Sequence, residues 1–253
     1  MLIDTHAHIH FDDYAARLDE VLANAEAAGV ERIVTVGVTA TDSVKAAALA
    51  EKHDHVYATV GHHPHDAKAL DAAAEQQLRK LAKHPKVVAV GECGLDYFRD
   101  LSPRGDQEAA FRFQIELALE NDLPMVWHVR DAFDQFFEIV DQYDGLRGIV
   151  HCFTSSRANM EKAVARGFLV ALNGIMTFTK DRSQLEAAKH LPLDHMALET
   201  DCPFLTPVPK RGQVNEPANV KLVAEFLADL RGESFEALSK TTSLNAQRLL
   251  KLA

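Results

Sequence analysis

The sequence has little of several features that mark specialised classes of protein. Its 253 residues include 3 cysteines, which leave one unpaired in any disulfide scheme and show no CxxC spacing. With 12 glycines and 9 prolines, a fibrous chain is excluded. A content of 47% hydrophobic residues excludes an intrinsically disordered one. We therefore expect a globular protein of a reducing compartment, with a core large enough to fold unaided.

Long apolar runs are also scarce. The longest smooth one, residues 167–179, is shorter than the ~18 residues that a membrane span needs, and it contains Asn173. The N-terminus has neither a basic n-region nor an apolar h-region, so no secretory signal is predicted. These features predict a soluble, cytoplasmic protein with no membrane partner.

Basic residues are outnumbered by acidic ones, 27 against 37, and the formal net charge is -10. This excess excludes a broad basic surface that grips nucleic-acid phosphates, so any contact with a polyanion has to be local. The chain does contain 13 histidines. Histidine is the commonest metal ligand, so the positions of these residues are informative.

Short apolar runs alternate with segments of helical period along the whole chain, which is typical of βαβ units and a parallel sheet. Eight such units in ~250 residues favour a (β/α)8 TIM-type barrel over an open sheet, and no GxGxxG or GxxxxGKS/T turn is present. We expect one α/β domain, residues 1–253, with strands at 2–5, 32–38, 56–61, 86–92, 124–129, 148–151, 168–173 and 195–200. Helices are expected at 14–28, 42–53, 72–83, 107–121, 133–143 and 157–166, and two more at 217–230 and 234–250.

Candidate metal ligands fall at the expected carboxyl ends of the strands, where barrel enzymes carry their active sites. Residues i and i+2 of a strand point the same way, so His6 and His8 can converge on one ion, although an HxH pair alone could equally be a hydrogen-bonded pair near a loop. Four further strand ends carry an imidazole or a carboxylate, which makes coincidence improbable. Six donors are too many for one tetrahedral zinc ion but suit two ions bridged by a carboxylate. The six are His6, His8, Glu92, His128, His151 and Asp201.

Other candidates concern phosphate. His62, His63 and His65 follow the third strand, and they either donate hydrogen bonds to an anionic substrate or form a loop that meets only water. Arg130 and the pair Lys210 and Arg211 could contact phosphate, because a guanidinium fork matches phosphate oxygens. Alternatively, an arginine pairs with Asp131 or Glu216 to order a loop.

Two groups of residues are interpreted as packing residues. Each cysteine directly follows a candidate ligand, and adjacent strand residues point in opposite directions, so the thiols should face away from the ions. Three phenylalanines at helical spacing should lie in the core and not form a base-stacking surface. These residues are Cys93, Cys152, Cys202, Phe133, Phe136 and Phe137.

Seven stretches carry a resemblance that runs from end to end of the chain. They are IDTHAH (3–8), GHHPHD (61–66), VAVGECGLDYFRD (88–100), LPMVWHVRDA (123–132), GIVHCFTSS (148–156), LETDCPFLTP (198–207) and RGQVNEPANV (211–220). In these stretches, in this order, the chain resembles the TatD family of metal-dependent deoxyribonucleases, within the amidohydrolase-like superfamily.

The resemblance implies a (β/α)8 barrel that binds two divalent ions, Mg, Mn or Zn. His6, His8 and Asp201 match the family's positions for one ion, His128 and His151 those for the other, and Glu92 the bridging carboxylate. His63 and His65 match histidines associated with the scissile phosphate, and Arg211 and Glu216 match the RGxxNEP loop. The sequence departs from the family pattern at His10, His62 and Val129, none of which is a ligand.

The ligand set and the resemblance together predict hydrolysis of DNA phosphodiester bonds, with 3′ to 5′ trimming of single-stranded ends as the expected mode. We expect Asp201 to act as general base beside the bridging Glu92, while Arg130 and Arg211 hold flanking phosphates. No obligate protein partner is evident. The alternative enzyme is a hydrolase of a small ester, amide or phosphotriester; many related barrels bridge their ions with a carboxylated lysine near the end of strand four, where this chain has Glu92. A catalytically silent binding scaffold would have lost ligands, and all six are present.

Overall fold

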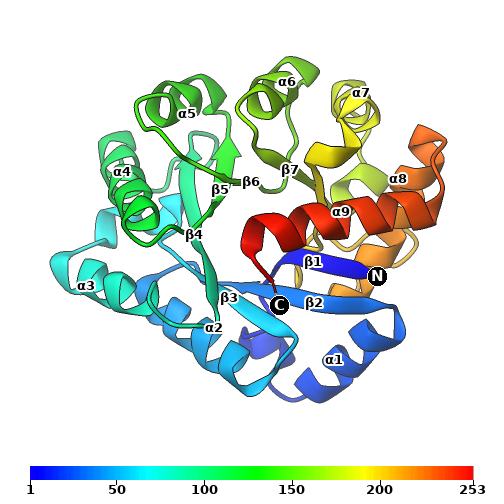
Figure 1. The fold of residues 1–253 in the computed structure, drawn as a ribbon, viewed down its shortest axis with the longest axis horizontal. Helices are drawn as coiled ribbons and strands as arrows, with labels where there is room; N and C mark the ends of the chain where they lie inside the picture. The colour runs from blue at the N-terminus through cyan, green and yellow to red at the C-terminus, as the bar shows by residue number, and fades with distance from the viewer. Residues whose placement is uncertain (253) are drawn as a thin grey trace. The chain divides into compact units, whose positions relative to one another are not determined.

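The computed structural model describes residues 1–252. In this part of the chain, strands and helices alternate, the strand pairs are parallel, and the strand order along the sheet follows the chain from β1 to β8 (Figure 1). This is the predicted (β/α)8 TIM-barrel fold. The strands are β1 (Leu2–Ala7), β2 (Val30–Val36), β3 (Val56–Val60), β4 (Val87–Asp96), β5 (Met125–Arg130), β6 (Gly148–Val150), β7 (Leu169–Leu172) and β8 (Met196–Leu198).

The helices confirm the predicted pattern with one addition. They are α1 (Leu18–Ala27), α2 (Ala40–Lys52), α3 (Ala72–Leu81), α4 (Arg104–Glu120), α5 (Phe133–Val140), α6 (Arg157–Ala165), α7 (Arg182–His190), α8 (Val220–Arg231) and α9 (Phe235–Leu250). The helix α7 is not predicted from the sequence. This helix is mostly polar, and only the small residues Ala187 and Ala188 are buried on it, so few apolar side chains mark it in the sequence.

The chain divides into two compact units. Unit 1 consists of Met1–Thr35 with His151–Ala253, and unit 2 is Val36–Val150. The interpretation of residues 1–253 as a single domain stays a prediction. No helix within residues 1–252 has the length and apolar character that a membrane span requires.

In unit 2, close pairing of β4 with β5 positions the ends of both strands. Gly94 lies opposite His128, and Asp96 lies opposite Arg130. Gly94 has a φ of 130°, and a Cβ atom there would lie 2.2 Å from the carbonyl oxygen of His128. Only glycine therefore allows β4 to continue to Asp96, four residues beyond the predicted end at Glu92.

Aromatic side chains form much of the core of unit 2, beside β5 and under α4 and α5. Trp127 and Phe136 are fully buried with ring centroids 5.5 Å apart, and Phe111 of α4 stacks on Phe136 at 5.9 Å. Phe133 and Phe137 are also buried, which confirms that these phenylalanines are core residues. Apolar rings at helical spacing thus attach α5 to the sheet.

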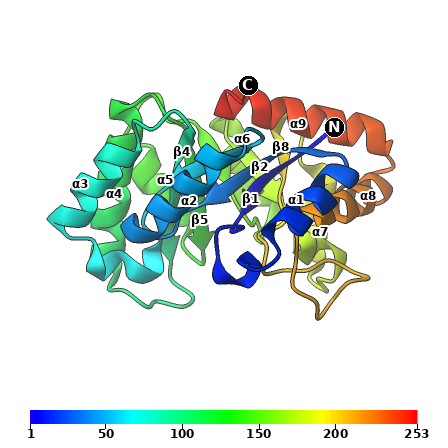
Figure 2. The ribbon, with the colours of Figure 1, turned by 90° about the horizontal axis from the view of Figure 1, so that it is seen from below.

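In unit 1, the C-terminal helix α9 packs against β1 and β8, and Figure 2 shows it beside the N-terminus. Asn245 of α9 donates side-chain hydrogen bonds to the carbonyls of Leu193 and Met196, at 2.8 and 3.0 Å. The hydroxyl of Thr5 in β1 donates to the carbonyl of Leu198 in β8 at 3.0 Å. The Asn245 bonds hold the start of β8, and the Thr5 bond joins β1 to the carboxyl end of β8, which several candidate ligands follow.

Replacing Phe136 by alanine should lower the free energy of unfolding by about 3–5 kcal/mol, because the buried ring leaves a cavity among its aromatic neighbours. Leu119→Ala is the control: Leu119 lies on α4 and is 40% exposed, so its change should stay within about 0.5 kcal/mol. Urea unfolding followed by circular dichroism measures both. Equal losses in the two variants would contradict this account of the core.

Candidate metal centre

In unit 1, the HxH pair at the end of β1 meets the segment that follows β8. The Nε2 atoms of His6 and His8 lie 3.3 Å apart, and Oδ1 of Asp201 lies 3.6 Å from the first and 3.4 Å from the second. Two backbone bonds hold this arrangement: the Asp201 N–H donates to the His6 carbonyl, and the His8 N–H donates to the Cys202 carbonyl, both at 2.8 Å. Three of the predicted ligands therefore come together.

The charge of Asp201 is stabilised by its neighbours. Burial by itself raises the pKa of this carboxyl, but the hydrogen bond from His8 and the charges of His6 and His151 outweigh burial, so the pKa lies below its usual value. Asp201 also has a φ of 54°, which non-glycine residues adopt rarely. Its neighbours hold the carboxylate in the anionic form that a cation requires.

His151 lies in the same cluster beside a carboxylate that the sequence analysis did not select. Its ring stacks on that of His6, with centroids 3.9 Å apart, and its Nδ1 lies 3.4 Å from Oε1 of Glu199. That oxygen also accepts hydrogen bonds from the Cys152 N–H at 2.7 Å and the Asn173 amide at 3.0 Å. The other carboxylate oxygen, Oε2, is buried and accepts no hydrogen bond from residues 1–252.

This orphaned oxygen tests whether the cluster suits a cation. A buried carboxylate oxygen without a partner is costly, and a divalent ion would satisfy it. One ligand atom each from His6, His151 and Glu199 lie within 4.8 Å of one another. Imidazole and carboxylate donors in this number fit a divalent metal. Glu199 precedes Asp201 by two residues, which is the sequence signal that could have identified it.

Asp4 supports this cluster from within the protein. The carboxyl group is fully buried and accepts hydrogen bonds from the Thr200 hydroxyl at 2.6 Å, the Thr200 N–H at 2.9 Å and the His6 N–H at 3.3 Å. Burial raises the pKa of Asp4 to about 8 despite these hydrogen bonds. Asp4 therefore joins the backbone of the HxH strand to the segment that carries Asp201.

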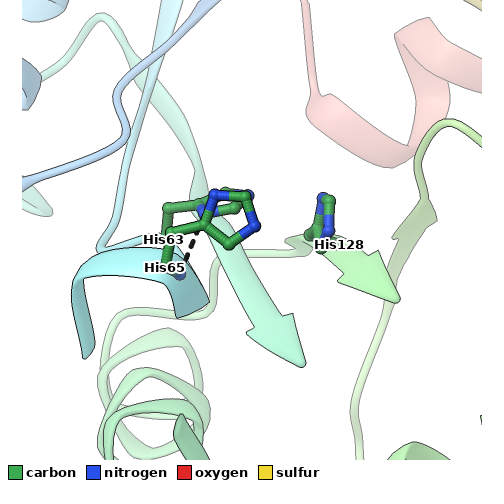
Figure 3. A group of neighbouring side chains, drawn as sticks. All are labelled: His63, His65 and His128. Carbon is green, nitrogen blue, oxygen red and sulfur yellow. Dashed lines mark hydrogen bonds between the residues drawn. The ribbon is translucent and has the colours of Figure 1, made fainter. Parts of the chain in front are cut away.

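In unit 2, three imidazoles face a common space (Figure 3). His65 lies in the 3-10 segment after β3, Pro64–Ala69, His63 is the N-cap residue of that segment, and His128 comes from β5. One ring nitrogen of each lies within 4.8 Å of the others. Oε1 of Glu92 lies 3.0 Å from Nδ1 of His128 and 3.3 Å from Nε2 of His63. The structure thus gathers predicted ligands and predicted phosphate-binding residues.

The state of His63 follows from its contacts. Burial lowers the pKa of His63 to about 4, so the ring is neutral at pH 7. Its Nδ1 accepts the backbone N–H of His65 at 3.1 Å. The single ring proton therefore sits on Nε2, which points toward Glu92 and can donate a hydrogen bond.

Asp96 is a residue that the sequence analysis missed, and it orients two of these rings. Its Oδ2 accepts hydrogen bonds from Nε2 of His65 at 2.8 Å and of His128 at 2.9 Å, and its Oδ1 accepts the N–H groups of Phe98 and Arg99 at 3.0 and 2.7 Å. Burial alone raises the pKa of Asp96, but these hydrogen bonds outweigh it and the pKa lies well below the usual value. The hydrogen bond to Asp96 occupies Nε2 of His128, so Nδ1, which lies toward Glu92, is the ring nitrogen that a metal ion would use.

The side chains of His62 and the three cysteines take no part in the two histidine clusters within residues 1–252. His62 lies outside the cluster, because its ring contacts the Asp66 carbonyl at 2.9 Å and its backbone is bound by Gln114. The thiols of the three cysteines are neutral at pH 7, because burial raises the pKa of each, that of Cys152 to about 12.

The candidate arginines stack on aromatic rings. Arg130 lies 3.9 Å from the centroid of Phe98, and Arg211 lies 3.8 Å from that of Phe178. Arg211 also donates to the Thr206 carbonyl at 2.8 Å. Within residues 1–252, neither arginine forms an ion pair with Asp131 or Glu216, the alternative partners named from the sequence. Glu216 pairs with Arg17 instead.

A (β/α)8 fold whose strand ends carry clusters of histidines and carboxylates is the architecture of a metal-dependent hydrolase. The chain belongs to the TatD family: the profile described as TatD related DNase matches residues 3–251. The chain is 41% identical over 254 residues to the "Uncharacterized metal-dependent hydrolase YabD" of Bacillus subtilis, covering 100% of both chains. It is 36% identical to the "3'-5' ssDNA/RNA exonuclease TatD" of Salmonella typhimurium, covering 99% of both. The crystal structure of YJJV, a TatD homologue of Escherichia coli, superimposes with a TM-score of 0.95 at 29% identity, over 100% of this chain and 98% of that one.

Replacing Asp96 by asparagine should weaken divalent-metal binding by about 10- to 100-fold, because His128 loses the anionic acceptor that orients it. Isothermal titration of the metal-free protein with Zn or Mn measures the affinity. Asp100→Asn removes a charge from the same segment without contact to either ring, and it should bind metal as the wild type does. Wild-type affinity in the Asp96 variant would contradict the orienting role.

Proposed function

We propose that the protein is a divalent-metal-dependent nuclease that hydrolyses phosphodiester bonds in single-stranded DNA by 3′ to 5′ trimming. The observation that carries the proposal is the cluster of His6, His8, His151 and Asp201, whose three imidazoles are buried, beside the orphaned oxygen of Glu199. Its donor set suits divalent ions. The similarity to the Salmonella typhimurium exonuclease supports the substrate class.

Two ions are proposed. His6, His8 and Asp201 would hold the first, and their mutual contacts in unit 1 support this assignment. His128 and His151 would hold the second ion, and Glu92 would be the carboxylate shared by both ions, because the motifs that contain these residues match those of the family.

The chain's own residues would perform distinct parts of the reaction. When bound, the ions would supply Lewis-acid charge and lower the pKa of the attacking water. Asp201, ionised at neutral pH, would accept the proton of that water. His63 donates from Nε2 to a phosphoryl oxygen, and as a neutral donor it needs no proton from solvent.

Holding the DNA strand falls to residues around this centre. His65 would contact the scissile phosphate together with His63, while Asp96 fixes the orientation of its ring. Arg130 and Arg211 would hold flanking phosphates as local cations on an otherwise acidic chain.

Glu92→Gln and Asp201→Asn should each lower the rate of nuclease cleavage by at least 100-fold in metal-repleted protein. Each substitution removes an anionic ligand, and Asp201→Asn also removes the proposed general base. End-labelled single- and double-stranded DNA with Mg, Mn or Zn provides the assay, and a p-nitrophenyl ester tests the alternative hydrolase. Glu120→Gln, an exposed substitution on α4, is the control. Ester turnover by the wild type without any DNA cleavage would favour the alternative and contradict the nuclease.

Removing divalent ions with a chelator should lower the melting temperature, because ion binding to the folded state adds about 2.7 kcal/mol at a concentration 100-fold above Kd. Differential scanning calorimetry with and without added metal measures the shift. His6→Gln should abolish most of it, whereas His190→Gln, on the surface of α7, should retain it. A wild-type protein that Mg, Mn and Zn all leave unshifted would contradict the metal centre.

A further inference from the structure

An exposed aromatic ring with a guanidinium stacked on it lies beside the histidines of unit 2. Phe98, in the segment that follows β4, is 56% exposed. The guanidinium carbon of Arg130 lies 3.9 Å from the centroid of this ring. Within residues 1–252, the side chain of Arg130 forms no ion pair or hydrogen bond, so its charge is available to a ligand.

The backbone around Phe98 is held at both ends, so the position of the ring is defined. The N–H of Phe98 donates to Oδ1 of Asp96 at 3.0 Å, and the N–H of Tyr97 donates to the Arg130 carbonyl at 2.9 Å. Further along, the hydroxyl of Ser102 donates to the His65 carbonyl at 2.7 Å. An anchored segment that presents an apolar ring to water is a preorganised contact surface.

The same carboxylate that anchors Phe98 also orients the histidines. Asp96 accepts hydrogen bonds from the rings of His65 and His128 through its other oxygen. In the pairing of β4 with β5, Arg130 lies opposite Asp96 and is two residues, about 7 Å, beyond His128. The ring and the guanidinium are therefore next to the group of imidazoles to which we assign the scissile phosphate.

We propose that Phe98 and Arg130 form a base-stacking subsite, in which the ring stacks on the nucleobase beside the scissile bond and Arg130 contacts the adjacent phosphate. This subsite rests on the proposed nuclease function. An aromatic side chain stacks on any base, because every base has a π face, and a guanidinium adds a cation–π contribution. Only an unpaired base can leave its own stack to use such a surface, so the subsite would favour single-stranded substrate ends.

The test compares Phe98→Leu with the wild type on three single-stranded oligonucleotides. One is intact. Each of the other two carries an abasic tetrahydrofuran residue at one of the two positions that flank the first cleaved bond. Phe98→Leu should lower kcat/KM on the intact substrate by about 10-fold, mainly through KM, since base stacking contributes to binding. On the abasic substrate that lacks the stacked base, the two proteins should cleave equally.

Matched variants separate stacking from a structural effect. Phe98→Trp keeps a stacking ring and should retain or improve wild-type kcat/KM. Leu101→Ala changes another exposed apolar residue of the same segment, 54% exposed, and should leave both substrates unaffected. Phe98→Leu activity equal to the wild type on intact DNA would overturn the subsite, and so would an equal loss on the intact and both abasic substrates.

A binding measurement gives a readout that does not depend on cleavage. With 2-aminopurine at the flanking positions, binding to the wild type in the presence of chelator should quench its fluorescence, and Phe98→Leu should remove most of the quenching. Unquenched binding by the wild type would overturn the subsite while leaving the nuclease intact. Wild-type protein that neither binds nor cleaves any oligonucleotide would overturn the nuclease proposal itself, and the subsite with it.

Discussion

The carboxylate of Asp96 organises unit 2. One of its oxygens accepts hydrogen bonds from two imidazoles, and the other accepts two backbone N–H groups of the next segment. This single anion therefore sets the tautomer of His128, the direction of His65 and the path of the chain to Phe98. Burial would disfavour its charge, but four donors compensate, which makes the anion stable at neutral pH. The proposed metal ligand His128, the proposed phosphate contact His65 and the exposed ring of Phe98 all depend on the same group.

Unit 1 places a second group of charges under a different constraint. His6, His151 and Glu199 are buried almost completely, and one oxygen of Glu199 has no hydrogen-bond partner within residues 1–252. Burying a carboxylate oxygen that has no hydrogen-bond partner is unfavourable, because the oxygen loses its hydration without compensation. The backbone bonds from β1 to the segment after β8 keep these side chains together. The cluster thus has the donors, the burial and the unsatisfied oxygen of a cation site.

The acidic composition and a nucleic-acid substrate are compatible because the proposed contacts are local. A net charge of -10 opposes a broad electrostatic grip on DNA. Two bound dications would add about four positive charges where one phosphate must lie. Stacking on an exposed ring would add affinity without requiring further positive charge. Such a site selects a strand end that can be separated from its partner and does not need a long duplex.

The periodicity of strands and helices, and hence the (β/α)8 fold, can be predicted from the sequence alone, and so can the residue types at the strand ends. These are local properties: apolar alternation and the i, i+2 rule can be read from short segments. The sequence pattern does not reveal α7, which is mostly polar. It also does not reveal the roles of Asp96 and Glu199, because these depend on residues 31 and 47 positions away along the chain. The folded structure is needed to show which carboxylates orient the histidines, which oxygen has no partner within residues 1–252 and which aromatic ring is exposed. Such facts arise when distant segments pack together, because burial and hydrogen-bond partners are properties of the folded chain.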